Sequence, residues 1–285
     1  MIIAANLTKR YGPTLALDNL SATIAQGAIF GLVGPNGSGK STLIRLLMGF
    51  IFPDAGTIRL EHARPHQIGY VPERPFFPPR CGVAEYLHTA GRLCGLPGGQ
   101  LHDAVALRLQ QVGLSQMAKQ PIGACSKGML QRFALAVALV NDPPLLILDE
   151  PMAGLDPAWQ KALRDIITAL NREGKTVLFS THRLSDVAEI CTHVGILNRG
   201  RLRRTGSLSE VLPLRQQVVI TLGSIPDHFI PPPGVTMAVN VITLSAGDLA
   251  RKAEVLRRLL DAGVDIQSLS QERATLEEVY LEAIR

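Results

Sequence analysis

The first 80 residues consist of short apolar segments separated by turns that are rich in Gly, Pro and Asp. Short apolar segments between such turns are typical of β-strands. The expected strands cover residues 2–5, 20–24, 29–33, 56–60 and 67–71. A Pro-rich loop around Phe76 and Phe77 follows them. We therefore expect the chain to begin with a β-rich region.

From residue 83 onward, apolar positions recur at helical spacing. The positions that would share one helix face are Leu101, Val105, Leu109 and Val112. Glycines at 95–99 divide the stretch 83–117 into at least two helices. Further helices are expected at 129–141 and 159–172, and continuously apolar strands at 145–148 and 176–179. Apolar strands that alternate with helices predict a parallel sheet covered on both faces.

The pattern changes again after Leu212 and Pro213. Strands are expected at 217–222, 235–244 and 265–269, helices at 248–262 and 275–284, and a Pro-rich break at 230–234. A segment of about 70 residues with this mixture fits a small α+β domain. We therefore predict one domain at 1–212, with a helical subdomain at about 83–140, and a second domain at 213–285.

Composition and length agree with a folded, globular chain of 285 residues. The hydrophobic share of 46% and the charged share of 19% suit a sizeable core. The longest apolar run, 133–140, is too short to cross a membrane. The apolar start, 1–5, is too short for a signal peptide. We therefore expect a cytosolic protein that reaches a membrane only through a partner.

Cysteines and net charge add no further chemistry. Cys81, Cys94, Cys125 and Cys191 show no metal-ligand spacing with the seven histidines, which predicts reduced thiols. The net charge is +5, but the basic residues are spread along the chain. Their one tight cluster, 199–204, surrounds an expected hairpin turn at 198–200 and is typical of a solvated strand face. We expect no nucleic-acid partner.

A glycine-rich turn connects the expected strand 29–33 to a helical segment that begins near Lys40. The turn reads G-x-x-x-x-G-K-S and consists of Gly34, Pro35, Asn36, Gly37, Ser38, Gly39, Lys40, Ser41 and Thr42. Glycines let successive N–H groups point into one concavity, and the helix start favours an anion there. Lys40 can reach β- and γ-phosphates, and the Ser41 hydroxyl can ligate Mg²⁺. Strand, turn and helix together predict a site for a nucleoside triphosphate.

Polar side chains follow two of the expected parallel strands. Asp149 and Glu150 come directly after the strand 145–148, and His182 follows the strand 176–179. The carboxyl ends of parallel strands line the same ligand crevice. Asp149 is placed to hold Mg²⁺, and Glu150 to polarise a water for attack on the γ-phosphate. An imidazole such as that of His182 can donate a hydrogen bond to the developing charge.

A second helix start precedes the helix expected at 129–141. Ser126 is a natural N-cap residue, and Gly128 keeps the turn open, so the segment 125–129 is a second potential anion site. The chain already contains one phosphate-binding turn. This second helix start is therefore expected to face the nucleotide of another subunit.

These motifs, in this order, resemble those of the ATP-binding subunits of ABC (ATP-binding cassette) transporters over residues 1–210. Residues 34–41 resemble the Walker A loop, 145–149 the Walker B strand, 125–129 the signature motif and 153–156 the D-loop. Glu150 falls at the position of the catalytic base and His182 at that of the switch histidine. Tyr11 falls at that of the aromatic residue that stacks on adenine. Glu73 falls where the family usually has the Q-loop glutamine.

The resemblance implies an α/β fold of the P-loop NTPase type, with a β-rich subdomain, a parallel-sheet core and a helical subdomain, extended here by the small α+β domain. It implies catalytic roles for Lys40, Glu150 and His182, and contacts of Ser126 and Gly128 with ATP bound to a second copy. The metal contacts implied are Ser41, Asp149 and Glu73. Two copies would close head to tail on two ATP molecules, and the movement would reach a separate membrane permease. The subunit would then lie on the inner face of the cell membrane.

This chain departs from the usual family pattern at the signature motif and at the Q-loop. The signature has Cys125, Lys127 and Met129 in place of Leu, Gly and Gln. Glu73 adds negative charge near the metal and, as a carboxylate, cannot donate a hydrogen bond. With the appended C-terminal domain, these features resemble exporter-type subunits that pair with a separate membrane protein.

Four further questions stay open at this level. The cassette could belong to the soluble branch of the family, which acts on ribosomes or DNA. It could also be a degenerate partner in a heterodimer, although Lys40, Asp149, Glu150 and His182 are all present. Cys125 could be a reactive thiol or a packing residue. The pair 76–77 could be an exposed socket for the permease, or both rings could be buried.

Overall fold

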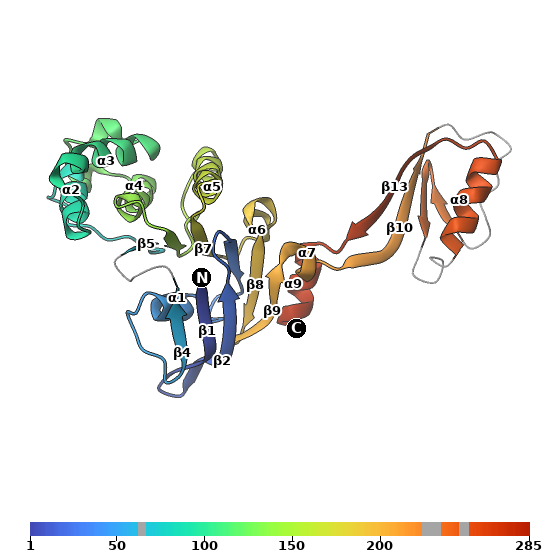
Figure 1. The fold of residues 1–285 in the computed structure, drawn as a ribbon, viewed down its shortest axis with the longest axis horizontal. Coiled ribbons are helices and arrows are strands. Elements are labelled where there is room, and N and C mark those ends of the chain that lie inside the picture. Colours follow the sequence, from blue (N-terminus) through green and yellow to red (C-terminus); the bar gives the residue numbers. More distant parts are fainter. Residues whose placement is uncertain (62–66, 224–234, 245–250) are drawn as a thin grey trace. The chain divides into compact units, whose positions relative to one another are not determined.

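The computed structural model describes residues 1–61, 67–223, 235–244 and 251–285 (Figure 1). The described chain divides into two compact units, Met1–Val211 with Tyr280–Arg285, and Leu212–Val279. The predicted second domain, 213–285, included the last six residues, which the structure places in the first unit. One cause is a hydrogen bond from Asn198 Nδ2 to the carbonyl of Ile284 (3.0 Å).

A six-stranded sheet forms the centre of the first unit, in the order β5-β6-β7-β3-β8-β9. Its strands are β5 (Ile68–Val71), β6 (Leu145–Leu148), β7 (Thr176–Thr181), β3 (Ile29–Val33), β8 (His193–Asn198) and β9 (Arg201–Ser207). All neighbouring pairs are parallel except β8 and β9. Every residue of β3 and β6 is buried, which explains why both sequences are continuously apolar.

A three-stranded antiparallel sheet, in the order β2-β1-β4, provides the β-rich region. Its strands are β1 (Ile2–Tyr11), β2 (Thr14–Ile24) and β4 (Ala55–Leu60). The first two are longer than expected, because the hairpin between them continues through polar, exposed residues up to Tyr11 and Thr14. Leu7, Leu17 and Leu20 from this sheet pack in one core with residues of β3 and of the first helix.

The described residues of the first unit contain seven α-helices before the chain enters the second unit (Figure 1). They are α1 (Lys40–Leu47), α2 (Val83–Leu93), α3 (Gly98–Gln111), α4 (Lys127–Leu139), α5 (Pro157–Arg172), α6 (Leu184–Ile190) and α7 (Leu208–Val211). Helices α2, α3 and α4 pack on one another and contain the predicted helical stretch. Helix α4 begins two residues before the predicted 129, because the hydroxyl of Ser126 accepts a hydrogen bond from the Met129 N–H (3.3 Å).

The second unit is a four-stranded antiparallel sheet with one helix. Its strands β10 (Leu214–Leu222), β11 (Thr236–Ala238), β12 (Val241–Leu244) and β13 (Ile266–Arg273) lie in the order β11-β12-β10-β13. Helix α8 (Lys252–Asp261) shares a core with β10 and β12, and α9 (Leu276–Ile284) ends the chain. The prediction of one strand at 235–244 is wrong, because a turn at Val239 (φ 50°) separates β11 from β12. The expected break at 230–234 and the start of the helix expected at 248 lie outside the described residues.

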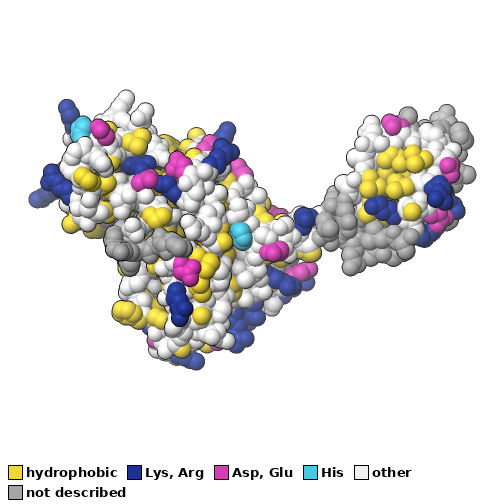
Figure 2. Space-filling model, viewed as in Figure 1, with side chains coloured by type: hydrophobic (Ala, Val, Ile, Leu, Met, Phe, Trp, Pro, Cys, Tyr) yellow, Lys and Arg dark blue, Asp and Glu magenta, His cyan; other side chains and the backbone are white. Residues whose placement is uncertain are grey.

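Charged side chains of both signs are interspersed on the visible face of the first unit (Figure 2). On β9, Arg201 pairs with Asp18 (2.7 Å), and the hairpin turn at Arg199 and Gly200 has positive φ at both residues. Over the described ranges of the chain, no helix combines the length and the apolar character that a membrane span requires.

Candidate nucleotide-binding site

The turn between β3 and α1 has a shape that only glycine permits at two positions. A Cβ on Gly34 would lie 2.2 Å from the carbonyl oxygen of Leu197. A Cβ on Gly39 would lie 2.6 Å from that of Ala16, and Gly39 also has φ +111°. The backbone of this turn is therefore held against β2 and β8, with its glycines required by close approach as well as by conformation.

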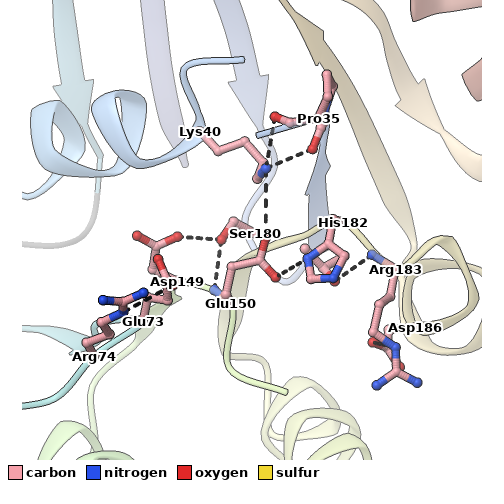
Figure 3. A network of polar contacts seen from close by, with 12 residues as sticks. Pro35, Lys40, Glu73, Arg74, Asp149, Glu150, Ser180, His182, Arg183 and Asp186 are labelled. Carbon is pink, nitrogen blue, oxygen red and sulfur yellow. Dashed lines mark hydrogen bonds and ion pairs between the residues drawn. The ribbon is translucent and has the colours of Figure 1, made fainter. Parts of the chain in front are cut away.

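Lys40 is the first residue of α1, and its side chain is buried. Its Nζ donates hydrogen bonds to the carbonyls of Gly34 (2.7 Å) and, more loosely, Pro35 (3.4 Å). The same ammonium lies 3.8 Å from Oε1 of Glu150 (Figure 3). A buried ammonium needs such partners, because its desolvation would otherwise be very unfavourable. Lys40 is thus held inside the turn and next to the carboxylate that follows β6.

A pocket of about 500 Å³ opens over this turn. Its lining residues are Thr14, Leu15, Ala16, Asn36, Gly37, Ser38, Gly39, Lys40, Ser41, Thr42, Glu73, Glu150, Ala153 and His182. Residues 14–16 were not expected from the sequence, since small or apolar residues in a strand carry no chemical signature. Ala153 belongs to the stretch that resembles the D-loop. Gly34 and Pro35 do not line the pocket but face Lys40 with their carbonyls.

Tyr11 lies at the end of β1, paired with Thr14 across the hairpin. It is 43% exposed and does not belong to the pocket lining, although its partner Thr14 does. The ammonium of Lys9 lies 5.9 Å from the centre of the Tyr11 ring. Stacking of Tyr11 on adenine remains a prediction.

The two acids after β6 differ in their environment. Asp149 is buried, its N–H donates to the carbonyl of Val71 (2.8 Å), and its Oδ1 accepts a hydrogen bond from Ser180 Oγ (2.6 Å). Glu150 has φ +47°, a left-handed conformation that is uncommon for a residue with a side chain. Its N–H donates to the same Ser180 Oγ (2.9 Å). No role for Ser180 was expected from the sequence.

His182 follows β7, and its Nδ1 lies 3.0 Å from Oε2 of Glu150 (Figure 3). The imidazole is more than half exposed, whereas the Glu150 side chain is 14% exposed. The structure therefore brings three predicted catalytic residues together, with the Glu150 carboxylate between the ammonium of Lys40 and the ring of His182.

The oxygen donors at the site suit a hard cation. Ser41 and Glu73 line the pocket, and Asp149 lies beside Glu150 at the end of β6. In the part of the chain that the structure describes, no group of three or more His, Cys, Asp or Glu could hold a metal alone. Mg²⁺ commonly binds through one or two carboxylates together with substrate phosphates, and these donors fit that arrangement. Glu73 is half exposed and lies 3.7 Å from the Arg74 guanidinium, so its attachment to the site is the loosest.

The start of α4 lies apart from this pocket. Ser126 is exposed, and a Cβ on Gly128 would meet nothing closer than 3.9 Å. Neither residue lines the pocket of its own chain. Lys127 lies over Gly154 of the D-loop, where a Cβ would be 3.4 Å from Lys127 Cε. Burial raises the pKa of the Cys125 thiol, which favours the packing interpretation over a reactive thiol.

The two phenylalanines of the Pro-rich loop have different environments. Phe76 is 88% exposed. Phe77 packs edge-to-face on Tyr86 (5.1 Å between ring centres) and on Phe133 (4.9 Å). The alternative that both rings are buried is therefore wrong, and the socket for the permease stays a prediction.

Fold, phosphate-binding turn and paired strand-end residues together define an ATP-binding cassette, and the chain belongs to the family of ABC transporter ATP-binding proteins. The family model for ABC transporters matches residues 17–153. The chain carries an ABC ATPase domain, as the motifs predicted.

Named relatives support this assignment over different lengths. The chain is similar to YxlF, an uncharacterized ABC transporter ATP-binding protein of Bacillus subtilis, with 32% identity over 294 residues, which cover 100% of this chain and 99% of YxlF. A similar protein of Nostoc, all4389, is 41% identical over 207 residues, 70% of this chain. Nod factor export ATP-binding protein I of Ralstonia nicotianae is 36% identical over 214 residues, covering 72% of this chain and 67% of the relative. The chain spans only 62% of the length of the Nostoc protein.

Solved structures confirm the predicted fold class. An ATP-binding subunit of an ABC transporter superposes with a TM-score of 0.70 and 28% identity, over 74% of this chain and 91% of that structure. A dimeric ATP-binding cassette in a post-hydrolysis state, bound to ADP and phosphate, gives a TM-score of 0.67 and 25% identity, over 73% of this chain and 99% of that structure. The shared architecture is mixed α/β, with a parallel-sheet core and helical elements.

Proposed function

We propose that this chain binds ATP with Mg²⁺ in the pocket over the phosphate-binding turn and hydrolyses it to power transport through a separate membrane permease. The observation that carries the proposal is the position of the Glu150 carboxylate, 3.8 Å from the Lys40 ammonium and 3.0 Å from the His182 ring. This arrangement combines a cation for phosphate, a base for water and a hydrogen-bond donor in one pocket.

The residues of the chain would act as follows. The N–H groups of the turn and the Lys40 ammonium hold the β- and γ-phosphates, with Lys40 exchanging its bonds to the Gly34 and Pro35 carbonyls for phosphate oxygens. Glu150 takes a proton from water while the water oxygen bonds to the γ-phosphorus. The bond from that phosphorus to the β,γ-bridging oxygen breaks, which releases ADP and phosphate. His182 donates a hydrogen bond to the γ-phosphate as its charge redistributes.

The donor set fits one magnesium ion, with Ser41 and Asp149 as its protein contacts and Glu73 as a weaker candidate. When bound, Mg²⁺ neutralises charge on the β- and γ-phosphates.

A second copy of the subunit completes the site in this proposal. Ser126 and Gly128 are accessible and lie outside the pocket of their own chain, as a contact in trans requires. The dimeric cassette with ADP and phosphate, which resembles this chain, supports a dimer, and we propose that its two copies are arranged head to tail. Tyr11 is proposed to stack on adenine.

The permease and the direction of transport are supported by the relatives. Several proteins similar to this chain are Nod factor export ATP-binding proteins, which favours export. The exposed ring of Phe76, three residues after Glu73, offers an apolar contact for a membrane subunit. The cassette would then sit on the cytoplasmic face of the membrane through that partner.

The test uses Glu150→Gln, which keeps the size of the side chain but removes its basicity. We expect this variant to bind ATP as the wild type does and to hydrolyse it about 10²–10⁴ times more slowly. Glu173→Gln, at the exposed end of α5, is the matched control and should hydrolyse ATP normally. With ATP and Mg²⁺ present, the Glu150→Gln protein is used to capture partners from native membranes.

Copurification of an integral membrane protein, dependent on ATP, is the expected result. Capture of ribosomes or DNA would instead favour the soluble branch of the family. A wild-type chain that binds ATP but does not hydrolyse it would point to a degenerate cassette and contradict the proposal.

A further inference from the structure

Ser180 is placed beside both acids by the register of the central sheet. Strands β6 and β7 are parallel neighbours, and Leu148 pairs with Phe179. The residues that follow this pair are Asp149, directly after β6, and Ser180, still within β7. Ser180 is completely buried, so its hydroxyl must find its partners inside the protein.

The hydroxyl of Ser180 binds both acids at once. It donates its proton to Asp149 Oδ1 (2.6 Å) and accepts the N–H of Glu150 (2.9 Å) (Figure 3). A hydroxyl has one proton and two lone pairs, so both bonds can form together. The short distance to Asp149 is typical of a hydrogen bond to an ionised carboxylate.

These two bonds fix different properties of the acids. The hydrogen bond to Oδ1 orients the Asp149 carboxylate, and Oδ2 takes no part in this hydrogen bond. The bond to the Glu150 N–H holds a residue with φ +47°, a conformation that side chains disfavour. With the backbone in this conformation, the Glu150 carboxylate reaches Lys40 and His182.

We propose that Ser180 is a positioning residue for ATP hydrolysis, whose single hydroxyl aligns the metal-binding carboxylate of Asp149 and the basic carboxylate of Glu150. The inference rests on the proposed function and names a residue that the motifs do not include. Ser180 does not line the pocket, so it would act through the two acids. Its loss therefore weakens metal binding and turnover, while metal-free binding of ATP to the turn persists.

The alternative is a purely structural role, in which the Ser180 hydroxyl only forms the hydrogen bonds that any buried hydroxyl needs. Thr176, at the opposite end of β7, provides the matched control. It is also buried, and its Oγ1 accepts the N–H of Gly27 (2.9 Å). Thr176→Val removes such a hydroxyl and keeps the shape of the side chain, far along the strand from the acids.

The experiment compares Ser180→Ala, Ser180→Thr and Thr176→Val with the wild type. Three quantities are measured: affinity for a fluorescent ATP analogue in EDTA, affinity for Mn²⁺ in the presence of ADP, and kcat and KM for MgATP. Residues that orient metal ligands typically change affinity or activity by about 10–100-fold. For Ser180→Ala we expect changes of that size in Mn²⁺ affinity and kcat, and an unchanged affinity in EDTA. Ser180→Thr keeps the hydroxyl and should restore most of both.

A Ser180→Ala protein that matches Thr176→Val in Mn²⁺ affinity and kcat would overturn the inference, as would a folded Ser180→Thr protein as slow as Ser180→Ala. If Ser180→Ala does not fold, Ser180→Cys takes its place and is judged by the same criteria. Cysteine has a similar volume, but its thiol is a much weaker hydrogen-bond donor. A wild-type chain without ATPase activity would overturn the proposed function, and this role for Ser180 with it. A wild-type chain that is active beside an unaffected Ser180→Ala protein would overturn the inference alone.

Discussion

Two helix starts in this chain offer N–H groups to an anion, and they differ in what encloses them. At α1, the N-cap Gly39 has a left-handed backbone without a side-chain cap, and the buried Lys40 follows it at a pocket of about 500 Å³. At α4, the exposed Ser126 caps the helix with its own hydroxyl, and Gly128 stands in open surroundings. The N–H groups of a helix start, which favour an anion, thus lie once in an enclosed pocket and once at an open surface.

The glycines show why this difference matters. Gly39 is required by its own fold, since a Cβ there would meet the Ala16 carbonyl at 2.6 Å. Gly128 is not required in this way, because a Cβ there would meet nothing closer than 3.9 Å and its φ is not positive. The proposed contact with a nucleotide on a second copy would account for a glycine at this position.

The largest effect is expected for Gly39→Ala. A residue with a side chain at this φ costs about 1–3 kcal/mol of folding free energy, before the clash with Ala16 is added. We expect a lower Tm and loss of ATP binding, measured by thermal unfolding and by a fluorescent ATP analogue. Unchanged values for both would show that the turn adapts and that its shape is not set by β2.

A comparably strong but purely functional effect is expected for Lys40→Ala. Loss of a preorganised cation at the phosphates should lower kcat/KM by about 10²–10³. Steady-state ATPase kinetics provide the measurement. The control is Lys161→Ala on the exposed face of α5, which should leave the kinetics unchanged. If the Lys40→Ala protein keeps its activity, the phosphates of ATP do not bind at Lys40.

Gly128→Ala separates the two helix starts most cleanly. Alanine is better than glycine inside a helix by up to about 1 kcal/mol, so the variant should be at least as stable as the wild type. Binding of ATP to its own turn should not change. Hydrolysis should fall by about 10–100-fold, because the new methyl group keeps the N–H donors of the helix start away from the γ-phosphate bound to the partner. Normal hydrolysis would mean that Gly128 makes no contact in trans.

The smallest effect is expected at Asp142, just beyond the opposite end of α4, where neither anion site is touched. Burial alone would raise the pKa of Asp142, but the hydrogen bond and charge of Lys175 and the charge of Arg108 outweigh it and lower the pKa. The carboxylate therefore stabilises the fold above its unfolded pKa, and this contribution is lost as the pH falls through the folded value. The side chain is 65% exposed, so solvent screening limits the effect to about 1 kcal/mol or less.

Urea unfolding of Asp142→Asn beside the wild type measures this effect. The variant should be less stable at neutral pH. The gap should begin to close below about pH 3.9, the usual pKa of an aspartate, and should disappear only below the lowered folded pKa. ATP binding and hydrolysis should not change. A gap that widens in acid would contradict the assigned direction of the pKa shift.

The sequence predicted the buried strands and the phosphate-binding turn well, for a physical reason. Strands β3 and β6 have the predicted bounds, because strands buried on both faces are apolar throughout and stand out from their flanking turns. The turn 34–42 combines residue types that phosphate chemistry demands at a fixed spacing. Both signals are local in the chain.

Features that depend on packing between distant segments could not be predicted. In the sequence, Ser180 is an ordinary strand residue. Its contact with Asp149 and Glu150 follows only from the pairing of β7 with β6. Phe77, in the Pro-rich loop, packs on Phe133 of α4, while its neighbour Phe76 stays exposed. The turn at Val239 was hidden in an apolar run, and 280–285 belong to the first unit only through contacts across the chain.

The most direct test of the central claim mixes two inactive variants. Lys40→Ala has an intact α4 start, and Gly128→Glu has an intact phosphate-binding turn. The glutamate near the helix N-terminus should be tolerated by the fold but repel the phosphates of a partner's ATP. We predict that each variant alone is inactive and that the mixture regains a clear part of the wild-type ATPase activity, because one site per mixed dimer is complete. A mixture as inactive as its components, although mixed dimers form, would show that the two helix starts do not share a nucleotide.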